Sequence, residues 1–283
     1  MISIIICTQH ERVSENLLLN IAKTIGVEFE LITINNEKNK YSIFEAYNIG
    51  VAKAEFSICC FMHDDIIYRS EDWGLRVLEY FKTNDELGAV AVAGCKYLRK
   101  MPSFWSIPIF NVFNIIQSDR KTHSSTKYWL NNSDAERVIV FDGMWFCVKR
   151  ELFDKIQFDS TTYNGFHFYD LDIAMQIHTM DYHILSVPNI LIEHTSSGSL
   201  NKYWLVSAFK FHNKWKSFLP VALADSTPEY SEELEDAAIV VILRTIFYEK
   251  AYLLLIDWLC VSIRIRGFIR FVFVLLKFFS KKI

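Results

Sequence analysis

The sequence predicts an α/β fold, in which helices flank a sheet and a helical tail follows, and two observations support this. Apolar strand-like runs alternate with amphipathic helix-like runs over the first 65 residues, and polar residues follow each strand-like run. The chain of 283 residues, 51% of them apolar, is long enough to bury a large core. We expect one large α/β domain with an appendage, or two smaller domains.

The first three strands and the helices between them form a βαβαβ unit. Residues 2–7, 29–34 and 58–62 are apolar runs, and residues 14–25 and 43–54 between them have helical periodicity. Such a unit favours a parallel sheet that binds ligands at the carboxyl ends of its strands. The polar residues at those ends include Thr8, Asn35 and Asp64.

The later elements alternate less regularly. The stretch 98–132 is aromatic and polar without a clear period, and we expect an irregular lid or binding loop there. Its aromatic residues, among them Phe104, Trp105, Tyr128 and Trp129, either contact a ligand or pack in the core. Helices are expected at 73–82, 150–155 and 169–180, and strands at 88–94 and 138–148. A last strand is expected at 184–187 with 190–193.

Charge is distributed unevenly along the chain. The net charge of −3 argues against a general nucleic-acid-binding protein, because phosphate binding needs a basic surface. Residues 237–283, however, hold eight lysines and arginines against two acidic residues, a net charge of +6 that leaves −9 on residues 1–236. Two regions with different partners are indicated.

The six cysteines indicate a reducing compartment. All lie in apolar stretches, and the sequence has no CxxC motif and no histidine tract with zinc spacing, so we expect buried free thiols. The apolar run 2–7 is too short for a signal-peptide core and lacks a basic leader. The expected location is the cytoplasm.

The tripeptide His63-Asp64-Asp65 is the most informative feature of the chain. It follows a buried strand, at the sheet edge where carboxylate oxygens would hold a divalent cation and a diphosphate. His194 follows another apolar strand and is expected to reach the same edge as a further ligand, and imidazole with carboxylate suits Mn²⁺ better than Mg²⁺. The simpler alternatives are an exposed turn at 63–65 and a structural His194.

Asp170 and Asp172 begin the helix expected at 169–180. An N-terminal cap explains one of these carboxylates but not both. A carboxylate at a helix start that faces the crevice is kept ionised by the helix dipole and is a candidate general base.

Taken in order, these motifs match a known family. The motifs are residues 3–8, Ile34-Asn35-Asn36, Ala46-Tyr47-Asn48-Ile49-Gly50, residues 61–65, Phe141-Asp142-Gly143, residues 169–172 and His194. On these motifs, residues 2–216 resemble the inverting glycosyltransferases of the family 2 type, particularly the StrF-like bacterial subgroup. The resemblance implies the GT-A fold, a Rossmann-like mixed sheet flanked by helices, and a metal-dependent enzyme.

The resemblance also implies a donor site for a nucleoside-diphosphate sugar, with UDP-sugar expected. Asp65 matches the carboxylate that joins metal and diphosphate, and His63 and His194 complete the expected Mn²⁺ or Mg²⁺ site. The residues implied to contact the donor are Thr8, Asn35, Asn36, Asn48 and Asp64.

Catalysis and acceptor binding are implied at the other end of the motif set. Asp170 matches the catalytic base and Asp172 supports it, so that the acceptor hydroxyl attacks the anomeric carbon with inversion. The residues implied on the acceptor side are Asp142, Gly143 and Trp145. A glycan or lipid-linked glycan of a bacterial surface polysaccharide is the expected acceptor.

Three residues depart from the family pattern. Asn35 replaces the usual Asp of the second loop, which leaves the nucleotide less defined. His63 replaces the first Asp of the metal motif, and Tyr169 replaces the Glu that usually precedes the base. One metal carboxylate and one base remain.

We expect a catalytic domain at 1–218, an acidic linker at 219–236 and a basic amphipathic helical region at 237–283. The last region has no uninterrupted apolar run of the ~18 to 20 residues that a membrane span needs. A helix lying on the inner face of the cell membrane, with its basic side toward anionic headgroups, is the expected arrangement. A tail folded against the catalytic domain or used in a homodimer is the alternative.

Two other functions are compatible with parts of the pattern. A sugar nucleotidyltransferase would share the nucleotide crevice, but residues 8–11 lack the glycine-rich signature expected after the first strand. A catalytically inactive, membrane-bound protein that binds a nucleotide sugar or glycan differs only in turnover, because Asp170 is present.

Overall fold

The structure is a computed structural model that describes residues 1–101, 103–118, 124–129, 134–195, 198, 200–226 and 231–280. It contains two compact units, each described by itself below. The first unit comprises Met1–Lys96 and Trp105–Gly198, and the second comprises Tyr97–Phe104 and Ser199–Ile283.

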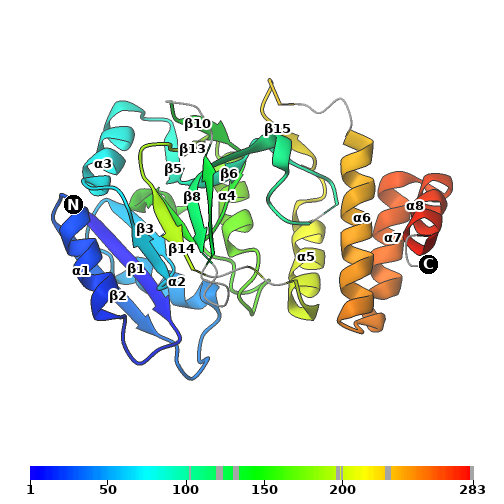
Figure 1. Ribbon diagram of the computed structural model, residues 1–283, viewed down its shortest axis with the longest axis horizontal. Helices are drawn as coiled ribbons and strands as arrows, with labels where there is room; N and C mark the ends of the chain where they lie inside the picture. The colour runs from blue at the N-terminus through cyan, green and yellow to red at the C-terminus, as the bar shows by residue number, and fades with distance from the viewer. Residues whose placement is uncertain are drawn as a thin grey trace. The chain divides into compact units, whose positions relative to one another are not determined.

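The first unit is built around a mixed sheet. Its strands are β1 (Ile2–Thr8), β2 (Phe29–Asn35), β3 (Ile58–Met62), β5 (Leu87–Ala91), β10 (Glu136–Val138), β12 (Trp145–Lys149) and β13 (His183–Ser186). Over the described residues the order is β10-β13-β5-β12-β3-β1-β2 (Figure 1). β1 is parallel to both β2 and β3, whereas β12 runs antiparallel between β3 and β5. The predicted α/β class with a mixed sheet is confirmed.

Helices cover both faces of this sheet. They are α1 (Glu15–Thr24), α2 (Ile43–Lys53), α3 (Trp73–Thr83) and α4 (Tyr169–Thr179). Leu17 of α1 and Val77 of α3 pack with Ile4 of β1 in one core cluster, and α1 and α3 lie on the same side in Figure 1. Tyr47 of α2 packs against Phe61 of β3 on the other face. Because both faces are covered, the central strands are apolar throughout.

Local sequence explains where α2 begins and how close it lies to the sheet. The Ser42 side chain accepts a hydrogen bond from the Glu45 N–H, and the Glu45 carboxylate accepts one from the Ser42 N–H, which makes a capping box. A Cβ atom on Gly50 would lie 2.3 Å from Ile5 of β1. Glycine is therefore required where α2 crosses the first strand.

A second sheet of the first unit corrects three sequence predictions. Its strands are β4 (Ile66–Tyr68), β6 (Ala93–Cys95), β8 (Asn111–Ser118), β9 (Ser125–Trp129), β11 (Val140–Phe141) and β14 (Ile192–His194). The stretch 98–132 is therefore not an irregular loop throughout, because β8 pairs with β6, β9 and β14. These long-range pairings have no local sequence signature.

The predicted strands 138–148 and 184–193 are each divided between the two sheets. β11 and β12 are separated by a turn at residues 142–144, and the Asp142 side chain accepts a hydrogen bond from the Met144 N–H within that turn. β13 and β14 are separated by a segment that contains Pro188. Turn chemistry interrupts both apolar runs where periodicity alone predicts one strand.

The second unit is mainly helical. It contains α5 (Lys202–Trp215), α6 (Ser231–Tyr248), α7 (Leu255–Arg266) and α8 (Phe268–Ser280), and the short strands β7 (Tyr97–Leu98) and β15 (Val221–Ala222) pair with each other. α6, α7 and α8 pack on one another (Figure 1). The buried Glu235 carboxylate accepts hydrogen bonds of 2.7 Å from the backbone N–H groups of Lys100 and Met101.

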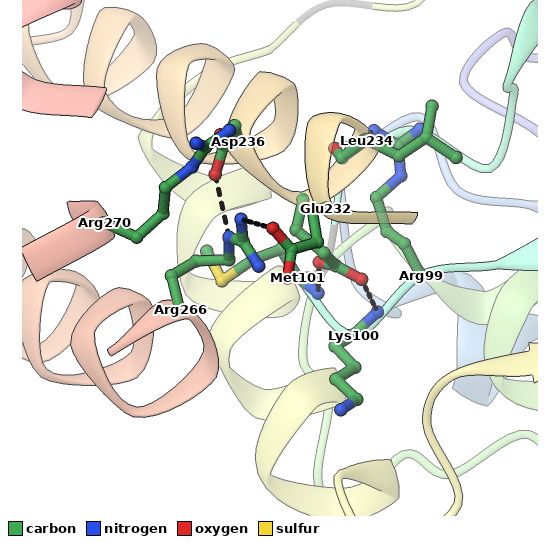
Figure 2. Close-up of polar contacts among 9 residues, drawn as sticks. Arg99, Lys100, Met101, Glu232, Leu234, Asp236, Arg266 and Arg270 are labelled. Atoms are coloured by element: carbon green, nitrogen blue, oxygen red, sulfur yellow. Dashed lines mark hydrogen bonds and ion pairs between the residues drawn. The ribbon is translucent and has the colours of Figure 1, made fainter. Parts of the chain in front are cut away.

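Ion pairs hold the last helices to α6. Arg266 contacts Asp236 at 2.8 Å and Glu232 at 3.1 Å, and Arg270 contacts Asp236 at 2.8 Å (Figure 2). Part of the basic charge predicted to face a membrane is thus used inside the unit.

The boundaries of the second unit differ from the predicted domains. Its longer segment begins at residue 199 and includes α5, which the sequence placed in the catalytic domain. The predicted acidic linker 219–236 ends in helix, because α6 begins at Ser231. Over the part of the chain that the structure describes, no helix has both the length and the apolar character that crossing a bilayer demands.

Candidate metal and nucleotide-sugar site

Three predicted ligands come together at one edge of the first unit. His63 and Asp65 follow β3, and His194 ends β14, which pairs with β4 immediately after Asp65. One ligand atom from each residue lies within 4.8 Å of the others. His194 Nε2 is 3.4 Å from Asp65 Oδ1, and His63 Nδ1 is 3.9 Å from the same oxygen.

The chemistry of this donor set fits a divalent transition metal. Two imidazole nitrogens and one carboxylate oxygen are ligands that Mn²⁺ accepts, whereas Mg²⁺ prefers oxygen alone. Burial and the nearby His194 lower the pKa of His63, so that its ring is neutral and has a lone pair to offer. Asp65, His63 and His194 are thus the residues that could hold a cation.

Each histidine makes a second contact on the side away from Asp65. His63 Nε2 is 2.7 Å from the Tyr169 hydroxyl, and His194 Nδ1 is 3.3 Å from Gln117 Oε1. Gln117 also donates from Nε2 to the His194 carbonyl oxygen at 3.2 Å. No sequence motif points to Gln117, because it lies in β8, which was not predicted.

Asp64 is directed toward the first strand. Its carboxylate accepts a hydrogen bond from the Thr8 hydroxyl, and the Thr8 oxygen in turn accepts one from the His10 N–H at 3.1 Å. The sheet register places Thr8 opposite Asn35 at the ends of β1 and β2. Three predicted donor residues are therefore neighbours at the carboxyl ends of the strands, as a parallel arrangement requires.

The two asparagines of the second loop are used in loop structure. The Asn36 side chain is buried. Its Nδ2 donates to the Tyr41 carbonyl oxygen at 2.8 Å, and its Oδ1 accepts from the Tyr41 N–H at 2.9 Å. Asn35 donates to the Glu11 carbonyl oxygen at 3.0 Å and accepts from the Glu37 N–H at 3.1 Å. Their predicted contact with the nucleotide stays a prediction.

Asn48 also has a structural use. Its Nδ2 donates to the Phe158 carbonyl oxygen at 2.7 Å, and its Oδ1 accepts from the Phe158 N–H at 3.0 Å. Both polar atoms of the amide thus hold the segment before α4 against α2. The predicted donor contact is untested by this geometry.

Asp170 lies in the first turn of α4, half-buried, with its carboxylate held by backbone groups. Oδ2 accepts from the Gly143 N–H at 3.0 Å and Oδ1 from the Leu171 N–H at 2.9 Å. Burial and the nearby Asp142 carboxylate nevertheless raise the pKa of Asp170 to about 7. A carboxylate with a pKa near neutrality is suited to accept a proton.

Asp172 faces the interior instead. It is buried and accepts hydrogen bonds from the Tyr163 hydroxyl at 3.3 Å and from Gln176 Nε2 at 2.8 Å. These contacts hold α4 in place, and the predicted support of Asp170 is therefore indirect.

The predicted acceptor-side residues separate into two groups. Asp142 accepts from Trp105 Nε1 at 2.9 Å, and Gly143 touches Asp170, so both lie beside the candidate base. Trp145 is fully buried in β12, where its Nε1 donates to the Tyr68 hydroxyl at 2.8 Å. We therefore assign the Trp145 indole to the core and leave it out of the acceptor side.

Phe166 is an aromatic residue at the site that the sequence analysis did not select. Its ring is 51% exposed, and its centroid lies 5.7 Å from the rings of both His63 and Tyr169. An exposed ring beside the metal ligands is a surface on which a sugar could stack. Of the aromatic residues named in the stretch 98–132, Trp105 lies near this site, and the side chains of Tyr128 and Trp129 lie outside the described residues.

Comparison with known proteins points to one family. The sequence matches the model of the glycosyltransferase-like family over residues 3–214. Of the curated proteins compared with the chain, none matches it.

The chain matches two solved structures when structures are compared. One is GalNAc-T7 with UDP, GalNAc and Mn²⁺, at 12% identity and a TM-score of 0.51, covering 76% of this chain and 49% of that chain. This chain therefore spans about half the length of that protein. The other is A197 from STIV, at 13% identity and a TM-score of 0.40, covering 69% and 86% of the two chains. Since the family model matches most of the sequence and the fold matches a GT-A structure, the chain belongs to the glycosyltransferase-like family.

Proposed function

We propose that the protein is an inverting glycosyltransferase that moves a sugar from a UDP-sugar to an acceptor hydroxyl. The proposal rests on one arrangement: the residue that holds His63 at the metal side, Tyr169, is followed directly by the candidate base Asp170. A cation-binding triad and a base of raised pKa are thus tied to the same turn of α4. A metal-dependent displacement needs both at one edge.

Donor binding is assigned to the ends of β1, β2 and β3. Asp65, His63 and His194 would hold Mn²⁺ or Mg²⁺, and a bound cation would offset the charge that develops on the departing diphosphate. Thr8 and Asp64, which are hydrogen-bonded to each other, would contact the nucleoside. The presence of UDP and Mn²⁺ in the GalNAc-T7 structure makes them the first donor nucleotide and ion to test.

Asp170 is assigned the proton transfer. As the acceptor oxygen forms its bond to the anomeric carbon, the bond from that carbon to the diphosphate oxygen breaks, and the acceptor proton passes to Asp170. The Gly143 and Leu171 N–H groups keep the carboxylate oriented. Attack on the face opposite the leaving group gives inversion.

The acceptor side is assigned to Asp142, Gly143, Trp105 and Phe166. Asp142 is fixed by the Trp105 indole, which leaves a polar wall beside the exposed Phe166 ring. A wall that combines polar groups with an aromatic face suits a glycan or a lipid-linked glycan. Assembly of a bacterial surface polysaccharide, in the StrF-like subgroup, is the process that we propose.

The helical unit is assigned to the surface of the membrane. α7 and α8 expose apolar side chains, with exposed fractions from 50% for Phe279 to 75% for Ile269, and Leu253 just before α7 is 96% exposed. Exposed basic residues lie on the same helical faces as these apolar residues. On α7, Arg264 follows Ile256 by about two turns, and on α8, Lys277 follows Phe273 by about one turn. Apolar and basic side chains on one helix suit anionic lipid headgroups at the cytoplasmic surface. A homodimer interface is the competing use of this surface.

Release of UDP or GDP from a panel of nucleotide sugars, with Mn²⁺ and with or without a membrane lipid extract, tests the function. We expect release from one donor by the wild-type protein and at least a hundredfold less by Asp65→Ala, since Asp65 is the carboxylate of the triad. Asp85→Ala removes an exposed carboxylate elsewhere on the first unit and should leave the rate unchanged. No release from any donor would favour a protein that binds without turnover.

A further inference from the structure

We propose that Tyr169 and Gln117 are positioning residues of the metal centre. Each holds one ring nitrogen of a histidine so that the other nitrogen faces Asp65. The inference rests on the proposed function, because it assumes that His63, Asp65 and His194 bind a cation. It adds the residues that decide which nitrogen of each ring is the ligand.

The geometry at His63 leaves one choice of ligand atom. Nε2 is 2.7 Å from the Tyr169 hydroxyl oxygen, and Nδ1 is the nitrogen on the side of Asp65, at 3.9 Å. For Nδ1 to offer a lone pair, the ring proton must be on Nε2, which then donates to the tyrosine oxygen. The Tyr169 oxygen can accept this hydrogen bond, so its position is compatible with the tautomer that binds metal and holds the ring with Nδ1 toward Asp65.

His194 shows the same arrangement with the nitrogens exchanged. Nδ1 is 3.3 Å from Gln117 Oε1, and Nε2 is 3.4 Å from Asp65 Oδ1. An amide oxygen can only accept, so the His194 proton is on Nδ1 and Nε2 offers the lone pair. Two histidines, one after β3 and one at the end of β14, are thus oriented toward one carboxylate by two neutral partners.

The position of the Tyr169 ring is fixed by packing. A Cβ atom on Gly143 would lie 2.2 Å from the Tyr169 hydroxyl oxygen, so only glycine leaves room for it. Tyr47 packs edge-on against the ring, with centroids 5.5 Å apart. Phe168, the N-cap residue before α4, has a φ of 72°, a left-handed conformation that costs a non-glycine residue about 1 kcal/mol or more.

The pair also accounts for two departures from the family pattern together. His63 stands where a carboxylate is usual, and Tyr169 stands where another carboxylate is usual, and the two side chains touch. A carboxylate ligand has no tautomer to select, whereas imidazole does. The Tyr169 hydroxyl oxygen is an acceptor to which the His63 Nε2–H can donate at this distance.

Binding of Mn²⁺ without donor, followed by electron paramagnetic resonance and calorimetry, tests the inference. We expect Tyr169→Phe, which keeps the ring and removes the oxygen, to weaken Mn²⁺ binding about 10- to 100-fold. Tyr47→Phe makes the same change in the adjacent buried tyrosine and should leave Mn²⁺ affinity within about twofold. Gln117→Met should weaken binding in the same way through His194.

A second pair of variants separates positioning from packing. In a His63→Asp background, the ligand has no tautomer, so adding Tyr169→Phe should change Mn²⁺ affinity by less than about twofold. An equal loss in both backgrounds, or no loss in Tyr169→Phe alone, would overturn the inference while leaving the metal centre in place. Absence of Mn²⁺ binding by the wild-type protein would overturn the metal centre and the inference together. Circular dichroism of each variant checks that it folds.

Discussion

Two groups of carboxylates, one in each unit, show opposite pKa shifts. In the second unit, Arg266 lowers the pKa of Glu232, and Asp236 is held between Arg266 and Arg270 (Figure 2). In the first unit, burial and the like charge of Asp142 raise the pKa of Asp170 to about 7. Paired carboxylates stabilise packing, whereas a carboxylate held near another is poised to exchange a proton. The difference indicates chemistry in the first unit and attachment in the second.

The two units also differ in the exposure of apolar side chains. In the first unit, Ile4 and Phe61 of the central strands are fully buried between helices. In the second unit, Ile256, Ile269 and Phe273 face outward on α7 and α8. Arg266 and Arg270 pair with acidic residues of α6. A net charge of +6 therefore overstates the basic surface of this region, because two of its arginines are engaged with acidic residues.

The largest expected effect separates chemistry from binding in the first unit. Asp170→Asn keeps the shape of the side chain but cannot accept the acceptor proton, so the rate of sugar transfer should fall about 10²- to 10⁴-fold. The affinity for UDP with Mn²⁺ should stay within about twofold, because Asp170 is not one of the three candidate ligands. Single-turnover kinetics and calorimetry measure the two quantities.

The matched control is Asp172→Asn, two residues further along α4. Because Asp172 contacts Tyr163 and Gln176 in the interior, the change should lower the melting temperature more than the rate. A loss of UDP affinity in Asp170→Asn equal to its loss of rate would contradict the assignment of a base.

Much of the first unit could be predicted from sequence because its signals are local. Continuous apolar runs and helical periodicity predicted β1, β2 and β3 with the helices between them, and three residues at the strand ends predicted the metal triad. The second sheet could not be predicted in this way. β8 pairs with β14 about 75 residues away, and only that pairing brings Gln117 to His194.

Residue roles were harder to predict than residue positions. Asn48 and Trp145 carry motif positions, yet one bonds the Phe158 backbone and the other is fully buried. Tyr169 was identified as a departure from the family pattern, and its contact with His63 depends on the room left by Gly143. Contacts of this kind follow from three-dimensional packing, which a single sequence does not specify.

The second prediction tests the outward-facing apolar surface of the second unit. Phe273→Glu should reduce binding to vesicles that contain phosphatidylglycerol by about tenfold or more. A phenylalanine that becomes buried in the bilayer contributes about 1.5 to 3 kcal/mol to the free energy of binding. Vesicle flotation at two ionic strengths measures this binding and its electrostatic part.

Leu19→Glu is the matched control, since Leu19 is an exposed apolar residue of α1 in the first unit. It should leave vesicle binding unchanged. If Phe273→Glu instead converts a dimer to a monomer by light scattering, with no vesicle binding in either protein, the surface is a homodimer interface and the two units differ in assembly rather than in membrane attachment.

The smallest expected effect concerns the like-charge pair that distinguishes the first unit. Asp142→Asn removes a negative charge that raises the pKa of Asp170, so the acid limb of the rate profile should move to lower pH. At pH 6, a base with a pKa of about 7 is about one-tenth ionised, and the variant should gain about two- to fivefold relative to its own plateau.

Trp105→Phe provides the control for this shift, because it removes the hydrogen bond to Asp142 and keeps the charge. Its acid limb should stay in place.

The same raised pKa of Asp170 also makes the stability of the folded protein depend on pH. Between about pH 4 and pH 7, Asp170 keeps a proton in the folded protein, whereas the same side chain in the unfolded chain has lost it. The contribution of Asp170 to stability therefore falls as the pH rises through that window. In metal-free protein, Asp142→Asn should make this decrease in stability with pH smaller. If the decrease becomes smaller but the acid limb of the pH–rate profile does not move, Asp142 raises the pKa of Asp170 but Asp170 is not the base.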